Sequence, residues 1–474
     1  MFMQQFFIKG LAHLSYLVGG KSTCAIVDPS RDIQIYLDAA DKMSLTITHI
    51  LQTHLHADFV SGHMDLAAKT GARIYVPKSA KCRFPHVALS EGDAFDIEDM
   101  TFHVLETPGH TPEHISYVVT DHSRGSDPVA VFTGDTLFVG DVGRPDLFPG
   151  IAQKLASLLF HSLHDKILKL PPFCEVYTAH GAGSLCGRSM GAKRITTIGY
   201  EKKYNKALQI RKEKAFIESL TTNMPAAPDH FSRCSAINRD GPARVSKMPR
   251  IAAMDPETFH KAASRKNSII LDIRPYESFG GMHVPGSFHI DFGGNFSTFA
   301  GWILPPDRSI LLVVESAAQA DEAAVLLRRV GLDAIPGFLE GGMFAWAKAG
   351  LPVAHVCQIA APELNKMLKK GAAVTILDVR APGEYKSFHI EGAVNIPVHD
   401  LRTRHGEINK EAHVVVACAS GHRSSLAASL LLQRGFQNVW NLSGGMTGFA
   451  AAGFAPVCPM CVAPHGPGAP EKGK

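Results

Sequence analysis

The 474-residue sequence has no long apolar run and little charge. No segment approaches the roughly 18 to 20 consecutive apolar residues that cross a bilayer, so we expect no membrane span. Charged residues make up 19 % and the formal net charge is +4, without a Lys/Arg block of the kind that binds nucleic acid. The first residues lack the basic leader and small-residue cleavage site of a secretory signal. We therefore expect a cytoplasmic protein that binds neither nucleic acid nor membranes.

The cysteines are odd in number and scattered, which argues against a disulfide framework. The sequence contains an odd number of cysteines, at Cys24, Cys82, Cys174, Cys186, Cys234, Cys357, Cys418, Cys458 and Cys461. Such spacing is typical of reduced intracellular thiols. Cys458 and Cys461 form a single Cys-x-x-Cys pair within a Pro/Gly-rich C-terminal segment. The role of this pair stays open, and we expect the tail that carries it to be flexible.

The C-terminal half contains an internal repeat. Leu271-Asp-Ile-Arg274 recurs as Leu377-Asp-Val-Arg380, and Gly341-Gly-Met recurs as Gly444-Gly-Met. Both landmarks return roughly 100 residues later, a period that indicates tandem domains rather than a solenoid. At roughly 150 residues per domain, the chain length also predicts about three domains. The predicted domains are residues 1–250, 251–355 and 356–474.

Hydrophobic patterning predicts the α/β class for all three parts. In the repeats, short apolar runs alternate with helical patterns, which predicts parallel sheets flanked by helices. The predicted strands of the repeats are 268–272, 310–314, 374–378 and 413–417, and the predicted helices are 321–329 and 424–433. In the first part we expect strands at 45–51, 100–105 and 129–133, helices at 64–70, 151–169 and 195–220, and a surface connector at 223–249.

Histidines and aspartates cluster in loops that follow the predicted strands of the first part. Thr53-His-Leu-His-Ala-Asp-Phe59 comes directly after an apolar run, and three further loops carry His110, Asp135 and His180. Loops at strand ends are where a rigid sheet usually presents binding and catalytic groups. A lone histidine is rarely a metal ligand, but four such loops in order predict a metal site.

This order of motifs resembles the metallo-β-lactamase fold, an αββα sandwich. In that family the full motif, His-x-His-x-Asp-His followed by His, Asp and His, binds two metals. Phe59 replaces the last histidine of the first motif, so one ligand of the second metal is missing. Phe59 and the sequence His-Gly-Ala-Gly-Ser-Leu-Cys-Gly at 180–187 are similar to the persulfide dioxygenase branch. That resemblance implies one Fe(2+) per chain held by His54, His110 and Asp135, surrounded by His56, Asp58 and His180.

The chemistry of this donor set fits the implied reaction. Two histidines and one carboxylate leave coordination positions open for a sulfur ligand and dioxygen. Asp58 is the residue we expect to orient the imidazoles. Arg144 matches the arginine that contacts the glutathione carboxylate in that family, or it forms a salt bridge with Asp141 or Asp146. Cys186 either holds a persulfide near the iron or packs as a small side chain.

A second motif lies in the last domain. Cys418-Ala-Ser-Gly-His-Arg423 joins a predicted strand to a predicted helix, where the helix N-terminus and Arg423 favour the thiolate. With Leu377-Asp-Val-Arg and Ser443-Gly-Gly-Met, this loop resembles rhodanese, which implies that Cys418 carries a persulfide. The middle repeat, residues 251–355, contains no cysteine and has Val314, Glu315 and Ser316 in the equivalent place. We expect this repeat to be an inactive rhodanese-like domain.

The resemblances imply a persulfide dioxygenase–rhodanese fusion. It would oxidise glutathione persulfide or another small thiol persulfide with O2 to sulfite, and interconvert sulfite, thiosulfate and persulfide on Cys418. Such chemistry serves sulfide detoxification or sulfur assimilation. Two alternatives stay open: a zinc-dependent thioester hydrolase of the glyoxalase II type fused to a sulfur carrier, and a non-catalytic sulfur carrier or sensor. The direction of transfer, the native thiol (glutathione, coenzyme A or other) and homo-oligomer formation also stay open.

Overall fold

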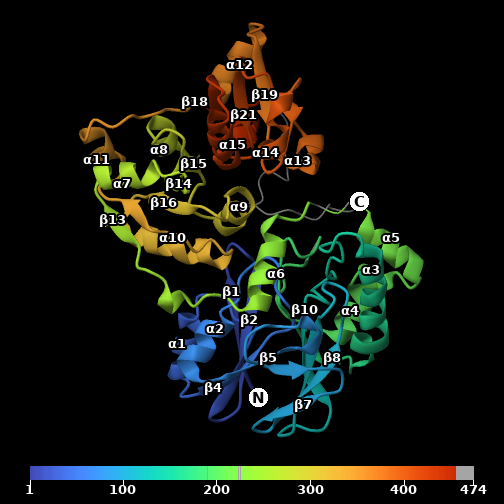
Figure 1. The fold of residues 1–474 in the computed structure, drawn as a ribbon. Coiled ribbons are helices and arrows are strands. Elements are labelled where there is room, and N and C mark those ends of the chain that lie inside the picture. The colour runs from blue at the N-terminus through green and yellow to red at the C-terminus, as the bar shows by residue number, and fades with distance from the viewer. Residues whose placement is uncertain (189, 223, 225, 455–474) are drawn as a thin grey trace. The chain divides into compact units, whose positions relative to one another are not determined.

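The computed structural model describes residues 1–454 except 189, 223 and 225 (Figure 1). The predicted tail with Cys458 and Cys461 lies outside the described residues. Two compact units divide the chain: Met1–Met248 with Arg328–Gly331, and Pro249–Leu327 with the described residues from Leu332 onward. None of the described helices is long and apolar enough to cross a membrane.

The first unit contains two six-stranded sheets. One sheet contains, in spatial order, β1 (Phe2–Ile8), β2 (His13–Gly19), β3 (Thr23–Val27), β4 (Thr46–Leu51), β5 (Arg73–Pro77) and β6 (Val87–Leu89). The other contains β12 (Thr196–Thr197), β11 (Glu175–Thr178), β10 (Pro128–Gly134), β9 (Ile115–Asp121), β8 (Met100–Glu106) and β7 (Ala94–Ile97). Its helices are α1 (Gln34–Lys42), α2 (His63–Thr70), α3 (Ala152–His161), α4 (Ile198–Tyr204), α5 (Glu213–Thr221) and α6 (His230–Asp240).

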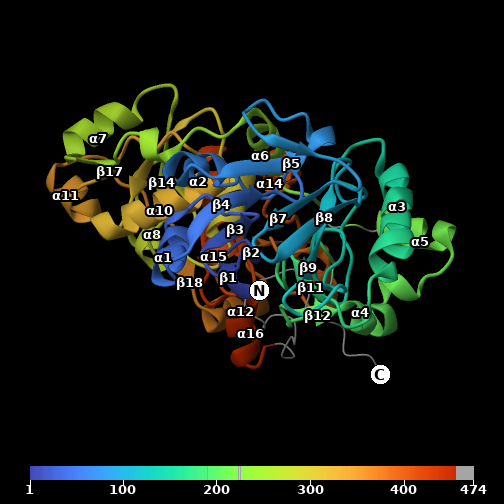
Figure 2. The same ribbon diagram turned by 90° about the horizontal axis from the view of Figure 1, so that it is seen from below.

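Burial of apolar side chains explains the layering of this unit. One core cluster joins side chains of both sheets, such as Leu14 and Phe102, and so lies between them. A second cluster joins the first sheet to α1 and α2, and a third joins the other sheet to α3 and α5. Figure 2 shows α1 and α2 at one side of the paired sheets and α3 and α5 at the other. The predicted αββα sandwich is confirmed.

The second unit contains two five-stranded sheets whose paired strands are all parallel. The first sheet contains β13 (Ala252–Met254), β17 (Gly337–Leu339), β16 (Ser309–Val313), β14 (Ser268–Asp272) and β15 (Phe288–His289). The second contains β18 (Cys357–Ile359), β22 (Val439–Leu442), β21 (His413–Ala417), β19 (Val374–Asp378) and β20 (Val394–Asn395). Because the strand order is the same in both sheets, the unit contains two copies of one fold.

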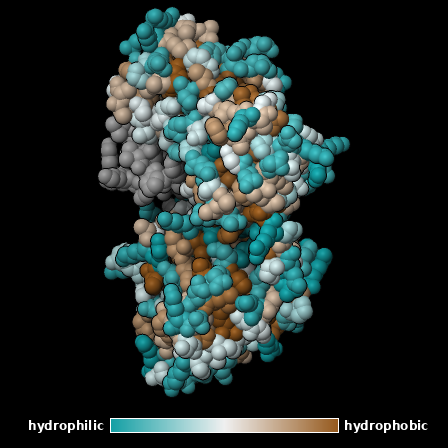
Figure 3. Space-filling view, turned by 90° about the vertical axis from the view of Figure 1, so that its left-hand side faces the viewer, coloured by the Kyte–Doolittle hydropathy of each residue, from teal (hydrophilic) through white to brown (hydrophobic). Residues whose placement is uncertain are grey.

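Helices flank the sheets of both repeats. They are α7 (Pro256–Ala263), α8 (Tyr276–Gly281), α9 (Phe296–Ile303), α10 (Ala317–Arg329), α11 (Gly342–Lys348), α12 (Ala361–Lys369), α13 (Pro382–Ser387), α14 (Leu401–Arg404), α15 (His422–Gln433) and α16 (Gly445–Ala451). Helix α7 begins with a strong start signal: the Asp255 side chain accepts hydrogen bonds from the backbone N–H groups of Glu257 and Thr258, and proline opens the helix. On the face drawn in Figure 3, hydrophilic and hydrophobic side chains are interspersed.

Two element predictions were wrong. The single helix expected over 195–220 is divided into α4, a 3₁₀ turn at Ala207–Gln209 and α5. The helix stops because the Asn205 side chain donates to the Asp141 carbonyl and accepts from the Ala207 N–H group. The surface connector expected over 223–249 contains α6, which buries Phe231, Cys234 and Asn238 on one face.

Candidate functional site

The loop after β4 carries the first metal-ligand motif. Asp28 accepts hydrogen bonds from the Thr53 N–H group and hydroxyl, each at 2.8 Å, and fixes the residue before His54. The Thr53 hydroxyl oxygen in turn lies 2.9 Å from His54 Nδ1. His54 and His56 are both fully buried, and their ring centroids are 4.2 Å apart. The strand end thus holds the two imidazoles side by side inside the protein.

Three predicted residues meet at the carboxyl ends of β4, β8 and β10. The ligand atoms of His54, His110 and Asp135 all lie within 4.8 Å of one another, and all three side chains are buried. His110 Nδ1 lies 2.9 Å from the Arg144 carbonyl oxygen. Because a carbonyl only accepts, Nδ1 carries the proton and Nε2 carries a lone pair.

The Nε2 atoms of His54 and His110 are buried and have no hydrogen-bond partner. They lie 3.8 and 3.3 Å from Asp135 Oδ2. An unsatisfied buried polar atom costs free energy, and two of them facing one carboxylate form a donor set that suits a divalent metal. This arrangement fits the predicted metal site, and the atoms themselves do not select one metal.

His180 lies between two carboxylates beside this donor set. Its Nδ1 is 2.7 Å from Asp135 Oδ1 and its Nε2 is 2.9 Å from Asp58 Oδ2. Burial disfavours the imidazolium, but the charges of Asp135 and Asp58 outweigh it and hold the pKa of His180 well above its ordinary value. His180 therefore serves as a charged bridge that positions Asp135.

Cys186 and Phe59 occupy the space next to this bridge. The ligand atoms of Asp58, His180 and Cys186 lie within 4.8 Å of one another. Burial, with a smaller effect of Asp58, raises the pKa of the Cys186 thiol to about 12. The buried Phe59 ring packs against His56, with ring centroids 4.5 Å apart. Phe59 thus places an apolar ring at the position where the two-metal motif has a histidine ligand.

The Cys418 motif lies at the carboxyl end of β21. Cys418 Sγ accepts a hydrogen bond from the Gly421 N–H group at 3.1 Å and from the Ser424 hydroxyl at 3.2 Å. These donors belong to the loop and first turn of α15, as expected of a helix N-terminus that stabilises an anionic sulfur. Arg423 forms a bidentate ion pair with Glu384, with both N–O distances at 2.7 Å.

The sheet register shows which residue of the middle repeat replaces the cysteine. Asp272 pairs with Val313 in one sheet and Asp378 pairs with Ala417 in the other, so Val314 corresponds to Cys418. Val314 is buried and has no nucleophilic atom.

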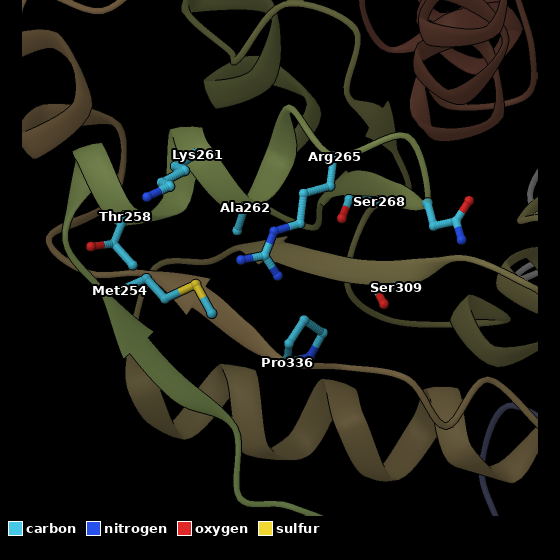
Figure 4. A pocket seen from close by; sticks show the side chains of 9 residues that line it. Met254, Thr258, Lys261, Ala262, Arg265, Ser268, Ser309 and Pro336 are labelled. Atoms are coloured by element: carbon cyan, nitrogen blue, oxygen red, sulfur yellow. The ribbon is translucent and has the colours of Figure 1, made fainter.

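A cavity of about 570 Å³ lies elsewhere on this repeat (Figure 4). Its lining includes Lys261 and Arg265 but no candidate metal ligand or cysteine.

Comparison with known proteins identifies the family of the first unit. A model of the metallo-beta-lactamase superfamily matches residues 8–174. Hydroxyacylglutathione hydrolase from Pseudomonas putida (strain GB-1) is 30 % identical over 215 residues, which cover 45 % of this chain and 79 % of that protein. The chain belongs to the metallo-beta-lactamase superfamily.

This superfamily domain is followed by tandem rhodanese-like domains. The rhodanese-like domain model matches residues 255–349 and 360–452. A crystal structure of a metallo-beta-lactamase from Staphylococcus aureus subsp. aureus COL is 34 % identical, with a TM-score of 0.65, and covers 71 % of this chain and 98 % of that chain. The crystal structure of ETHE1 from Myxococcus xanthus is 27 % identical, with a TM-score of 0.45, and covers 50 % of this chain and 98 % of that chain.

The structure shows the contacts of two residues to which the sequence assigned roles, Asp58 and Arg144. Asp58 does not orient His54 or His110, because its carboxylate contacts His180 instead. The Arg144 side chain is only 2 % exposed and bonds both oxygens of Asp146 and the Leu185 carbonyl. The structure therefore shows the salt-bridge alternative for Arg144, whose backbone carbonyl orients His110.

Sequence reasoning missed several residues that support the metal site. The Asn238 side-chain amide donates to the carbonyls of His56 and Phe59, and its oxygen accepts from the Ser61 N–H group. His114 Nε2 accepts a hydrogen bond from the Asp135 N–H group. The spacing of Phe231, Cys234 and Asn238 on one helical face was the available signal for α6. His114 follows a predicted motif by four residues and carried no separate signal.

Proposed function

We propose that the metallo-beta-lactamase domain is a persulfide dioxygenase with one Fe(2+) per chain, held by His54, His110 and Asp135. The observation that carries the proposal is the pair of buried, unpartnered Nε2 atoms facing Asp135. Ferrous iron bound there would supply redox chemistry and open positions for a sulfur ligand and O2. Phe59 supports a single metal, because an aromatic ring cannot serve as a ligand for a second one.

The proposed overall reaction converts a thiol persulfide, O2 and water into the free thiol and sulfite. The outer sulfur is oxidised and dioxygen is reduced, so no further oxidant is needed. The chain's own residues hold the site rigid: Thr53 and the Arg144 carbonyl fix the two imidazoles, and His180 fixes Asp135. Glutathione persulfide or another small thiol persulfide is the proposed substrate.

The proposed second activity belongs to the last rhodanese-like domain. The Cys418 thiolate attacks the outer sulfur of thiosulfate, and the sulfur–sulfur bond breaks to release sulfite and leave a persulfide on Cys418. A thiol acceptor then takes the sulfur and regenerates the thiolate. The Gly421 N–H group and the Ser424 hydroxyl stabilise the anionic sulfur through the bonds that Cys418 Sγ already accepts. The reverse direction would use sulfite made by the dioxygenase.

A second candidate for the first domain is a zinc-dependent thioester hydrolase. The similarity to hydroxyacylglutathione hydrolase favours this candidate. Metal analysis of protein purified without chelators separates the two. We expect about one iron per chain and no turnover of a glutathione thioester, since Phe59 replaces one histidine of the two-metal motif. Two tightly bound zinc ions with thioester hydrolysis would establish the hydrolase instead.

A further inference from the structure

The middle repeat touches the loop that carries Cys418. Both repeats belong to one compact unit, and Tyr276, the first residue of α8, lies against Gly421. A Cβ atom added to Gly421 would lie 2.8 Å from Tyr276 Cζ, so the ring packs directly on the loop backbone. The Tyr276 hydroxyl oxygen also accepts a hydrogen bond from the Gly444 N–H group at 3.3 Å. The N–H group of Gly421 is itself a donor to Cys418 Sγ.

Asp291 of the middle repeat joins this contact to the next loop residue. One carboxylate oxygen, Oδ2, accepts a hydrogen bond from the Tyr276 N–H group at 3.2 Å and lies 2.6 Å from His422 Nδ1. His422 stands between Gly421 and Arg423 and is 46 % exposed, whereas Asp291 is 19 % exposed. The Tyr276 and His422 rings meet edge to face, with centroids 5.3 Å apart. One carboxylate therefore fixes both the covering tyrosine and the loop histidine.

We propose that the middle repeat is part of the sulfur-transfer site, with Tyr276 and Asp291 as positioning residues that hold the Cys418 loop through Gly421 and His422. This inference rests on the sulfur transfer proposed above for Cys418. It gives the cysteine-less repeat a defined role, because its loops shape the site of its neighbour although its own sheet lacks the nucleophile. Tyr276 and Asp291 also hold the loop backbone at Gly421, whose N–H group donates to Cys418 Sγ.

The charge state of His422 determines the strength of this contact. The hydrogen bond to Asp291 raises the pKa of His422, burial acts against it, and the negative charges of Asp291 and Glu277 raise it further. Arg423, the adjacent cation, is paired with Glu384. A raised pKa means that the charged pair is fully formed at acidic pH and is lost as pH rises through the folded-state value. The loop is therefore held most firmly below that pH.

The test is thiosulfate:thiol transfer by the full-length protein, measured from about pH 6 to about pH 9, across the range in which histidines titrate. In the wild type we expect kcat/KM for thiosulfate to fall at alkaline pH. In Asp291→Asn this fall should move to lower pH, and kcat/KM should be about five- to tenfold lower, the size expected for weakening one partly exposed hydrogen bond. Asp307→Asn, which changes an exposed acid of the same repeat, is the matched control.

Two further measurements keep the result decisive. Tyr276→Phe retains the ring but not the hydroxyl, and should lower kcat/KM without moving the pH profile. Nuclear magnetic resonance titration of His422 should show a lower pKa in Asp291→Asn than in the wild type. An unchanged pH profile and kcat/KM in Asp291→Asn, with wild-type transfer intact, would overturn this inference alone. Absence of transfer in the wild type would instead overturn the proposed sulfurtransferase activity on which it rests.

Discussion

At the scale of single residues, hydrogen bonding at one imidazole nitrogen decides what the other can do. The carbonyl of Arg144 holds the proton on His110 Nδ1, which directs the Nε2 lone pair toward Asp135. His54 has the same arrangement with Thr53 at its Nδ1. Sequence motifs identified His54, His110 and Asp135, and the structure brings them together. The group that orients His110 was not predictable, because a residue of any type can supply a backbone carbonyl.

Removing one of these lone pairs tests the metal site. His110→Ala should lose bound metal and oxygen uptake, because two remaining donors hold a divalent ion poorly. Sulfur transfer by Cys418 should remain, since the two activities use separate residues. Metal content and oxygen consumption are the measurements, and His103→Ala, which changes an exposed histidine of β8, the strand that precedes His110, is the control. Retention of full metal content in His110→Ala would contradict the ligand assignment.

The second residue-scale prediction concerns the nucleophile. Cys418→Ser should abolish thiosulfate consumption, because a hydroxyl is a poor nucleophile and forms no persulfide. Oxygen uptake from a supplied persulfide should continue. Cys357→Ser, which changes an exposed thiol, should behave like the wild type in both assays. Thiosulfate turnover that survives in Cys418→Ser would place the nucleophile elsewhere, with Cys186 as the first thiol to examine.

At the scale of secondary-structure elements, strands were predictable and helix limits less so. The strands before each motif begin and end close to their apolar runs, since a buried strand is recognised by those runs alone. Asn205 ended a long helical pattern because its side chain donates to the distant Asp141 carbonyl and accepts from the nearby Ala207 N–H group. Helix α6 escaped prediction because its buried face is short and contains a polar residue, Asn238, whose partners lie far away in sequence.

Asn238 gives α6 a measurable role. The Asn238 side-chain amide bonds the backbone of the loop between His56 and Ser61 through two donated hydrogen bonds and one accepted hydrogen bond. Asn238→Ala removes all of these bonds and leaves the buried backbone groups of the loop unsatisfied. We expect a loss of about 1–3 kcal/mol in unfolding free energy and weaker metal retention. Thermal unfolding and metal analysis are the measurements. Ser232→Ala, an exposed position of α6, is the control, and equal effects of both variants would contradict this role.

At the scale of the whole molecule, motif order and the internal repeat predicted the architecture. The αββα domain and the two parallel-sheet repeats follow from patterns that extend over many residues, and the structure has both. The contact of the middle repeat with the Cys418 loop had no signal in the sequence. It depends on Tyr276 and Asp291, which are ordinary residue types in positions that only the packed repeats bring to the loop.

The middle repeat provides a test of what makes a rhodanese loop active. In a Cys418→Ser background, Val314→Cys should restore no sulfur transfer above the Cys418→Ser level. The new thiol would face Gln319 where the active loop has Arg423, and Glu315 next to it would disfavour an anionic sulfur. The thiosulfate assay of the double variant measures this directly. Recovery of transfer would show that a cysteine at the strand end suffices.

Oxygen consumption with glutathione persulfide is the measurement that tests the central claim most directly. An oxygen electrode follows O2 while sulfite is measured in the same sample, using protein as purified and its His110→Ala variant. We predict that wild-type protein consumes oxygen in step with sulfite formation and that the variant consumes none. Wild-type protein that hydrolyses a glutathione thioester, contains two zinc ions per chain and consumes no oxygen would contradict the claim.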